Sequence, residues 1–127
     1  MALTKTQVDE IIAKQKYAKE QFLSAWKDGV SLHPELFDIT TSSGDIDTAN
    51  DKWQLCPASE DEWKNIICKL SRGERTFLAS MVSFYNSSRG QDLLTEIGSD
   101  NICDIASRLD ETRSRIITTL FMNYGGW

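Results

Sequence analysis

Apolar residues recur at every third or fourth position near the start of the chain. This spacing places them on one face of a helix, with charged residues on the opposite face. We therefore expect a helix over residues 5–28, capped by Thr4 with Gln7 or by Thr6 with Asp9 and ended by Gly29. The face that should lie in the core comprises Val8, Ile11, Ile12, Ala18, Phe22, Ala25 and Trp26.

Residues 30–58 interrupt this pattern. Two prolines, a Thr-Thr-Ser-Ser-Gly run and scattered aspartates are typical of turns and loops. One helical turn is expected over residues 33–37, and Ile46, Trp53 and Leu55 are expected to anchor the segment to the core. A connection of this length within a compact domain is uncommon, so it is either functional or partly mobile.

Helix signals return at residue 59. Ser59 with Glu62, and Ser71 with Glu74, each form the pattern of a capping box ahead of an apolar stripe. The pattern predicts two helices joined by a tight corner.

The rest of the chain continues as helix to residue 124. A short helix should end at Gly98, and Asp110 is a suitable cap for dividing the last segment in two. The sequence therefore predicts one all-α domain over residues 1–127. It is expected to be a bundle of five or six helices, formed by residues 5–28 and 59–124, with a long acidic loop excursion over about 30–58.

Negative charge is concentrated in this excursion and the residues that follow it. The chain has 19 acidic and 14 basic side chains, and from Val30 to Glu62 eight carboxylates stand against one cation, Lys52. We call these eight the acidic belt: Glu35, Asp38, Asp45, Asp47, Asp51, Glu60, Asp61 and Glu62. The charge balance argues against non-specific binding to nucleic acid or anionic lipid. The belt is either a surface for a positively charged partner or a solvated loop.

The expected location is cytoplasmic, with no membrane partner. No stretch approaches the ~20 apolar residues of a membrane span, and the N-terminus lacks the apolar segment of a secretory signal. The three cysteines, Cys56, Cys68 and Cys103, have no spacing typical of a disulfide framework.

Residues suited to catalysis or metal binding are scattered along the chain. The single histidine, His33, precedes a proline, and neither a nucleophile elbow nor a phosphate-binding glycine loop is present. The cysteines and His33 are too far apart for the usual ligand spacing of structural zinc. Cys68 and Cys103 adjoin apolar stripe residues and are expected in the core. We expect no catalytic residue, cofactor or metal, and an enzyme of unknown type is the second alternative function.

Residues 104–116 have the spacing of small and apolar residues that is typical of a helix-turn-helix. Ala106 stands where two helices would touch, Leu109 follows three residues later, and Ile116 comes seven residues after that. The pattern resembles that of bacterial helix-turn-helix regulators, over this segment only. The resemblance implies a DNA-binding regulator whose base and phosphate contacts come from Arg108, Thr112, Arg113 and Arg115.

The segment also departs from that pattern. Asp110 occupies the turn position usually taken by glycine, and Asp104, Asp110 and Glu111 would face the phosphates. The acidic balance of the chain works against DNA binding as well, so this function is the first alternative.

Two tryptophans lie outside the helical stripes. Trp53, inside the acidic belt, fits an aromatic anchor with a charged rim. Trp127 follows two glycines and either folds back onto the core or is presented to a partner.

The leading prediction is a small non-enzymatic protein that binds another macromolecule, most readily a protein with a basic surface, as an inhibitor, modulator or accessory factor. Exposed apolar positions on the C-terminal helices are compatible with a homodimer. The residues predicted to bind the partner are Asp38, Asp45, Asp47, Asp51 and Trp53.

Overall fold

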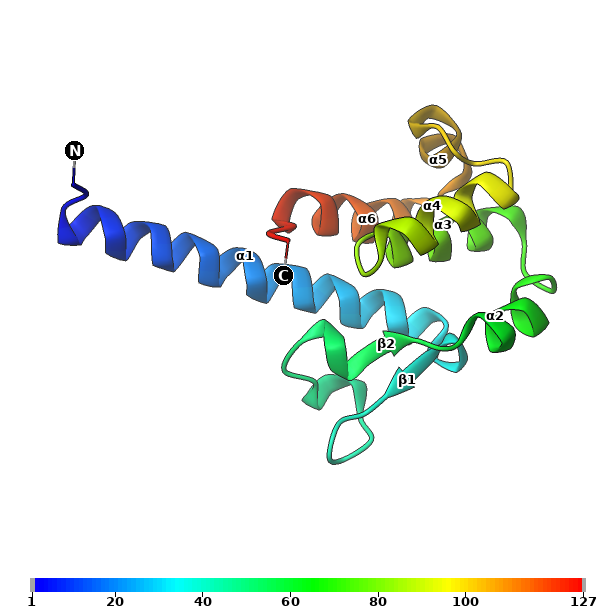
Figure 1. Ribbon diagram of the computed structural model, residues 1–127, viewed down its shortest axis with the longest axis horizontal. Coiled ribbons are helices and arrows are strands. Elements are labelled where there is room, and N and C mark those ends of the chain that lie inside the picture. Colours follow the sequence, from blue (N-terminus) through cyan, green and yellow to red (C-terminus); the bar gives the residue numbers. More distant parts are fainter. Residues whose placement is uncertain (1, 127) are drawn as a thin grey trace.

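The computed structural model of the protein describes residues 2–126, and Trp127 lies outside the described residues. Within that range it contains six α-helices and a two-stranded sheet (Figure 1), which confirms the predicted all-α fold. The helices are α1 (Lys5–Leu32), α2 (Glu60–Ile67), α3 (Arg72–Ser83), α4 (Ser87–Glu96), α5 (Ile102–Arg108) and α6 (Glu111–Asn123).

The first helix begins as predicted and ends later. Thr4 and Gln7 form a reciprocal capping box at its start. The predicted stop at Gly29 is wrong, because the helix continues to Leu32. Gly29 instead allows α1 to cross α3 closely, since a Cβ there would lie 2.6 Å from Cε of Met81.

The excursion after α1 is ordered and contains short strands that the sequence did not predict. Strands β1 (Phe37–Ile39) and β2 (Leu55–Pro57) pair antiparallel, with Asp38 opposite Cys56. The predicted turn over 33–37 is confirmed as a 3-10 turn at Pro34–Leu36. Two further 3-10 turns occur at Ile46–Thr48 and Lys52–Gln54.

The core lies along the C-terminal half of α1. Figure 1 shows the excursion on one side of this helix and α3 to α6 on the other, with α6 running antiparallel to α1. Trp26 at the centre is fully buried, and its indole N–H donates to the carbonyl of Leu55 at 3.0 Å. Trp63 of α2 is buried too and donates to the carbonyl of Leu36 at 2.8 Å. Both buried indoles therefore anchor the excursion to the helices.

The helix starts in the second half follow the predicted caps. The side chains of Ser59 and Ser71 accept from the backbone N–H groups of Glu62 and Glu74. Asp110 accepts from the N–H of Arg113, which confirms the break between α5 and α6.

Two predictions of burial are wrong. Val8, Ile11 and Ile12 are 38%, 43% and 56% exposed, because the N-terminal half of α1 projects beyond the other elements (Figure 1). Cys68 and Cys103 are exposed as well. Both follow apolar residues in sequence but lie on the solvent side of their segments.

Candidate functional site

The acidic belt lies on the surface formed by the excursion and the start of α2. Seven of its eight residues are exposed, and Asp51 is half-buried. The exposed carboxylates of this surface are therefore in contact with solvent.

Little within the chain neutralises this charge. Among residues 2–126, the basic side chain that approaches a belt carboxylate is that of His33, whose Nδ1 lies 3.9 Å from Oε1 of Glu35. Asp51 has a different role, because its Oδ1 accepts from the N–H groups of Trp53 and Gln54 at 3.0 and 3.2 Å. Asp38, Asp45 and Asp47 remain as exposed carboxylates without a cation partner in the described part of the chain.

The loops that carry these aspartates are tied to α1. Lys27 of α1 donates to the backbone carbonyl of Asp47 at 2.9 Å. The hydroxyls of Thr41 and Thr48 both donate to the carbonyl of Asp45 at 2.9 Å. The carboxylates therefore project from a backbone held by hydrogen bonds.

Lys52, the one cation within the belt, turns away from it. Its side chain is buried, and Nζ donates to the carbonyl of Phe84 at 3.0 Å. The same nitrogen lies 4.9 Å from the ring centre of Trp53 and 5.6 to 5.8 Å from three other rings, those of Phe22, Tyr85 and Tyr124. Burial lowers the pKa of this lysine, while the four rings favour the cation.

Trp53 is presented at the edge of this aromatic cluster. It is 55% exposed, and its ring centre lies 4.9 Å from that of Tyr85. The prediction that Trp53 anchors the excursion to the core therefore holds only in part, because the ring contacts Tyr85 but more than half of the residue is exposed. The exposed part of the residue lies within the segment that carries the belt.

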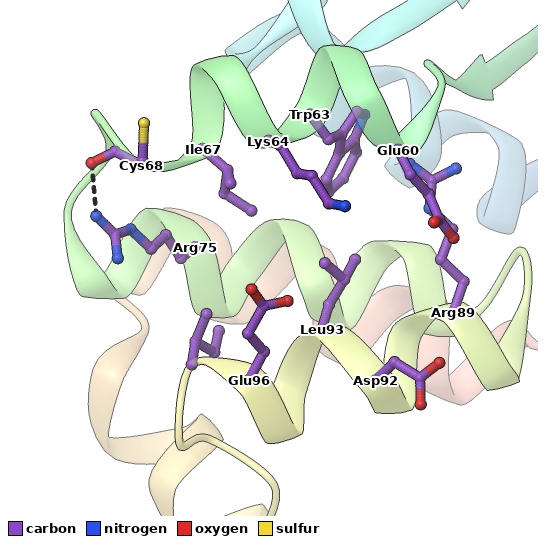
Figure 2. Close-up of a pocket in the computed structure, with 11 residues that line it drawn as sticks. Glu60, Trp63, Lys64, Ile67, Cys68, Arg75, Arg89, Asp92, Leu93 and Glu96 are labelled. Atoms are coloured by element: carbon purple, nitrogen blue, oxygen red, sulfur yellow. Dashed lines mark hydrogen bonds between the residues drawn. The ribbon is translucent and has the colours of Figure 1, made fainter.

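A groove of about 440 Å³ lies between α2 and α4 (Figure 2). Ile67 of α2 and Leu93 of α4 point toward one another across it, and Trp63 lies at its inner wall. At one end Arg75 donates to the carbonyl of Cys68 at 2.7 Å, which ties α3 to the end of α2. The exposed charged residues along its two rims are Glu60, Lys64, Asp92 and Glu96.

Arg89 closes the other end of the groove. Its guanidinium carbon lies 5.1 Å from the ring centre of Trp63, and one terminal nitrogen donates to the carbonyl of Ala58 at 2.7 Å. Neither Arg75 nor Arg89 therefore offers a fully free guanidinium to a ligand.

The four residues proposed for DNA binding do not form one exposed surface. Thr112 and Arg115 are exposed, and Arg115 pairs with Glu111 at 2.6 Å. Arg108 donates to Ser99 and to the carbonyl of Gly98. The helix pair is present, but this arginine is engaged in holding α5 against the rest of the fold.

Arg113 points inward to a polar cluster that the sequence did not predict. It pairs with Asp110 at 2.6 Å and donates to Nε2 of His33 at 3.2 Å. Glu74 lies 3.7 Å from the same ring nitrogen. A ring nitrogen that accepts a hydrogen bond belongs to a neutral histidine, and burial, together with the charge of Arg113, lowers the pKa of His33. The ring itself is 5% exposed, so this cluster connects helices and is closed to a substrate.

Within residues 2–126, no three His, Cys, Asp or Glu side chains are placed to hold a metal ion, and no helix has the length and apolar character of a membrane span. No protein-family model matches the chain, and neither a curated protein nor a solved structure shows significant similarity to it. Function is therefore inferred from the residues and their geometry.

Proposed function

We propose that this protein binds another protein that presents a basic surface, with the acidic belt and Trp53 as its contact residues. One observation carries the proposal: seven of the eight belt carboxylates are exposed, and Lys52, the one lysine between residues 30 and 62, is turned into the interior. Such an array generates a negative field that steers a cationic partner.

Trp53 adds the apolar contact that a charged rim lacks. Interfaces derive most of their affinity from a few buried aromatic or arginine anchors, and the surrounding charges contribute to orientation and rate of association. A half-exposed indole already in contact with Tyr85 loses little freedom when a partner covers its exposed part. The protein would then act by occupying a basic surface, as an inhibitor, modulator or accessory factor.

The test is a pull-down from lysate, with nuclease-treated and untreated halves and mass spectrometry of the retained proteins. A belt variant, Asp38→Asn with Asp45→Asn and Asp47→Asn, removes three exposed charges and keeps Asp51, which caps a turn. Exposed ion pairs contribute about 0.2–1 kcal/mol each, so losing three of them should lower the affinity for a true partner roughly 3- to 150-fold. Its dependence on salt should also become weaker.

A matched control variant carries Asp9→Asn, Glu10→Gln and Asp100→Asn, which are exposed acids outside the belt. It should retain partners as the wild type does. Equal loss in both variants, or retention by the belt variant with an unchanged salt dependence, would show that the belt is only a solvated surface.

DNA binding remains the second candidate because Thr112 and Arg115 are exposed at the start of α6. Retention that disappears after nuclease treatment would favour it. Arg115→Ala should then weaken a gel shift without affecting the fold, since this side chain is fully on the surface.

A further inference from the structure

The projecting half of α1 carries an apolar ridge that the rest of residues 2–126 leaves exposed. Residues 5–17 are all exposed, and the ridge comprises Val8, Ile11 and Ile12 at the spacing of one helical face. Isolated helices of this length are marginal in water. An uncovered apolar stripe on such a helix is typical of a binding surface.

The opposite end of the molecule carries the groove between α2 and α4. Ile67 of α2, Leu93 of α4 and Ile97 at the end of α4 are its apolar lining residues, and Figure 2 shows Ile67 and Leu93 pointing into the groove. A groove formed by two helices commonly receives the apolar face of a third, through residues three and four apart. The ridge has this spacing.

We propose that the ridge of one copy of this chain docks in the groove between α2 and α4 of a second copy. The charges beside the two features match. With about 100° of rotation per residue, Lys19 lies in line with the ridge and Lys16 lies about 40° from Ile12 on its flank, where it also approaches Glu20 at 4.0 Å. The α4 rim of the groove carries Asp92 and Glu96, which are exposed and have no ion-pair partner among residues 2–126.

The geometry makes this association head-to-tail. In Figure 1 the free end of α1 and the pair α2 and α4 lie at opposite ends of the long axis, so a chain cannot fill its own groove. A heterologous contact of this kind leaves one free ridge and one free groove on every assembly, and it continues into a ring or a filament. Three apolar side chains bury less than the standard ~800 Å² per partner, so the contact is weak and concentration-dependent.

The test is sedimentation velocity of the purified chain from about 10 µM to about 1 mM, where weak contacts with Kd values in that range become populated. The average mass should rise with concentration for the wild type. It should remain that of a monomer for a ridge variant, Lys16→Glu with Lys19→Glu, and for a rim variant, Asp92→Lys with Glu96→Lys. All four positions are exposed, so both variants should fold.

An equimolar mixture of the two variants provides the decisive measurement. The acidic ridge of the first fits the basic rim of the second, and the lysine ridge of the second fits the acidic rim of the first. Association should therefore return on mixing. A control variant, Lys69→Glu with Arg115→Glu, carries the same charge change at exposed positions elsewhere and should associate like the wild type.

Three results would overturn the proposal. The first is a wild type that stays monomeric across the concentration range. The second is a rim variant that associates by itself. The third is a mixture that fails to restore association although each variant alone is monomeric. The second result would indicate that two ridges pair with each other. These measurements use the purified chain alone, so they are independent of the function proposed for the acidic belt.

Discussion

The two halves of α1 follow the same apolar period and lie in opposite environments. Phe22 and Trp26 are 2% and 0% exposed, whereas Val8 and Ile12, on the same side of the same helix, are 38% and 56% exposed. The difference lies in the neighbours, because the excursion and helices α3 and α6 cover only the second half. Periodicity identifies the apolar face of a helix, and the tertiary arrangement decides whether the same chain covers it.

The largest loss in the free energy of unfolding is expected from a substitution at the centre of the covered half of α1. Trp26→Ala removes the largest enclosed side chain of α1 and leaves the carbonyl of Leu55 without its donor. We expect a loss of about 3–5 kcal/mol in the free energy of unfolding, measured by urea denaturation. Trp26→Phe keeps most of the packing and should lose less.

The matched substitution in the projecting half is Ile12→Ala. Because the side chain is more than half exposed, it should change the free energy of unfolding of dilute protein by less than ~0.5 kcal/mol. Similar losses at Trp26 and Ile12 would contradict the contrast between the two halves.

The substitution Gly29→Ala should distinguish the effect of packing on the free energy of unfolding from the effect of helix propensity. In an uncovered helix, alanine in place of glycine stabilises by up to ~1 kcal/mol. At Gly29 the new methyl would meet the side chain of Met81, so we expect a loss of roughly 1–2 kcal/mol instead. Thermal and urea unfolding should both show it. A gain in stability would mean that Met81 moves aside freely.

A pH dependence of stability is expected at the covered end of α1. The pKa of His33 is lowered in the fold, so the unfolded chain binds a proton first as pH falls below 6.5. The stability should therefore decrease as pH falls from about 6.5 toward the lower folded-state value. The urea midpoint at several pH values between 7 and 5 measures this.

His33 is the only histidine in the chain, so His33→Gln should abolish this decrease over the same interval. The pKa of Glu74 is also lowered, chiefly by the N–H of Ser71, and its stabilising effect is lost only below 4.5. A midpoint that still falls between pH 7 and 5 in the variant would place the titration elsewhere.

Local signals in the sequence predicted much of the helical framework. Thr4, Ser59, Ser71 and Asp110 all cap helices where their spacing indicated, because a cap is a contact between residues three apart. The strands could not be predicted, since segments of three residues such as Phe37–Ile39 carry no period and depend on their pairing. The exposure of Val8 was missed because it depends on the absence of a neighbour.

The candidate site was predicted less completely. Local charge identified the exposed aspartates, but nothing in the sequence indicated that Lys52 turns inward or that Arg113 meets His33, which is 80 positions away. The sequence pattern indicated the apolar stripes of α2 and α4, which include Ile67 and Leu93. That they face one another across an open groove depends on the path of the chain between them.

The hydrogen bonds that hold the excursion also affect the thermodynamics of any binding event there. A disordered acidic segment must be ordered by its partner, which opposes binding by about 2–5 kcal/mol and adds a large negative heat-capacity change. Here the ladder between β1 and β2 and the bond from Lys27 to the carbonyl of Asp47 already fix the backbone. Calorimetry on a complex should therefore show a heat-capacity change that reflects the contact area alone.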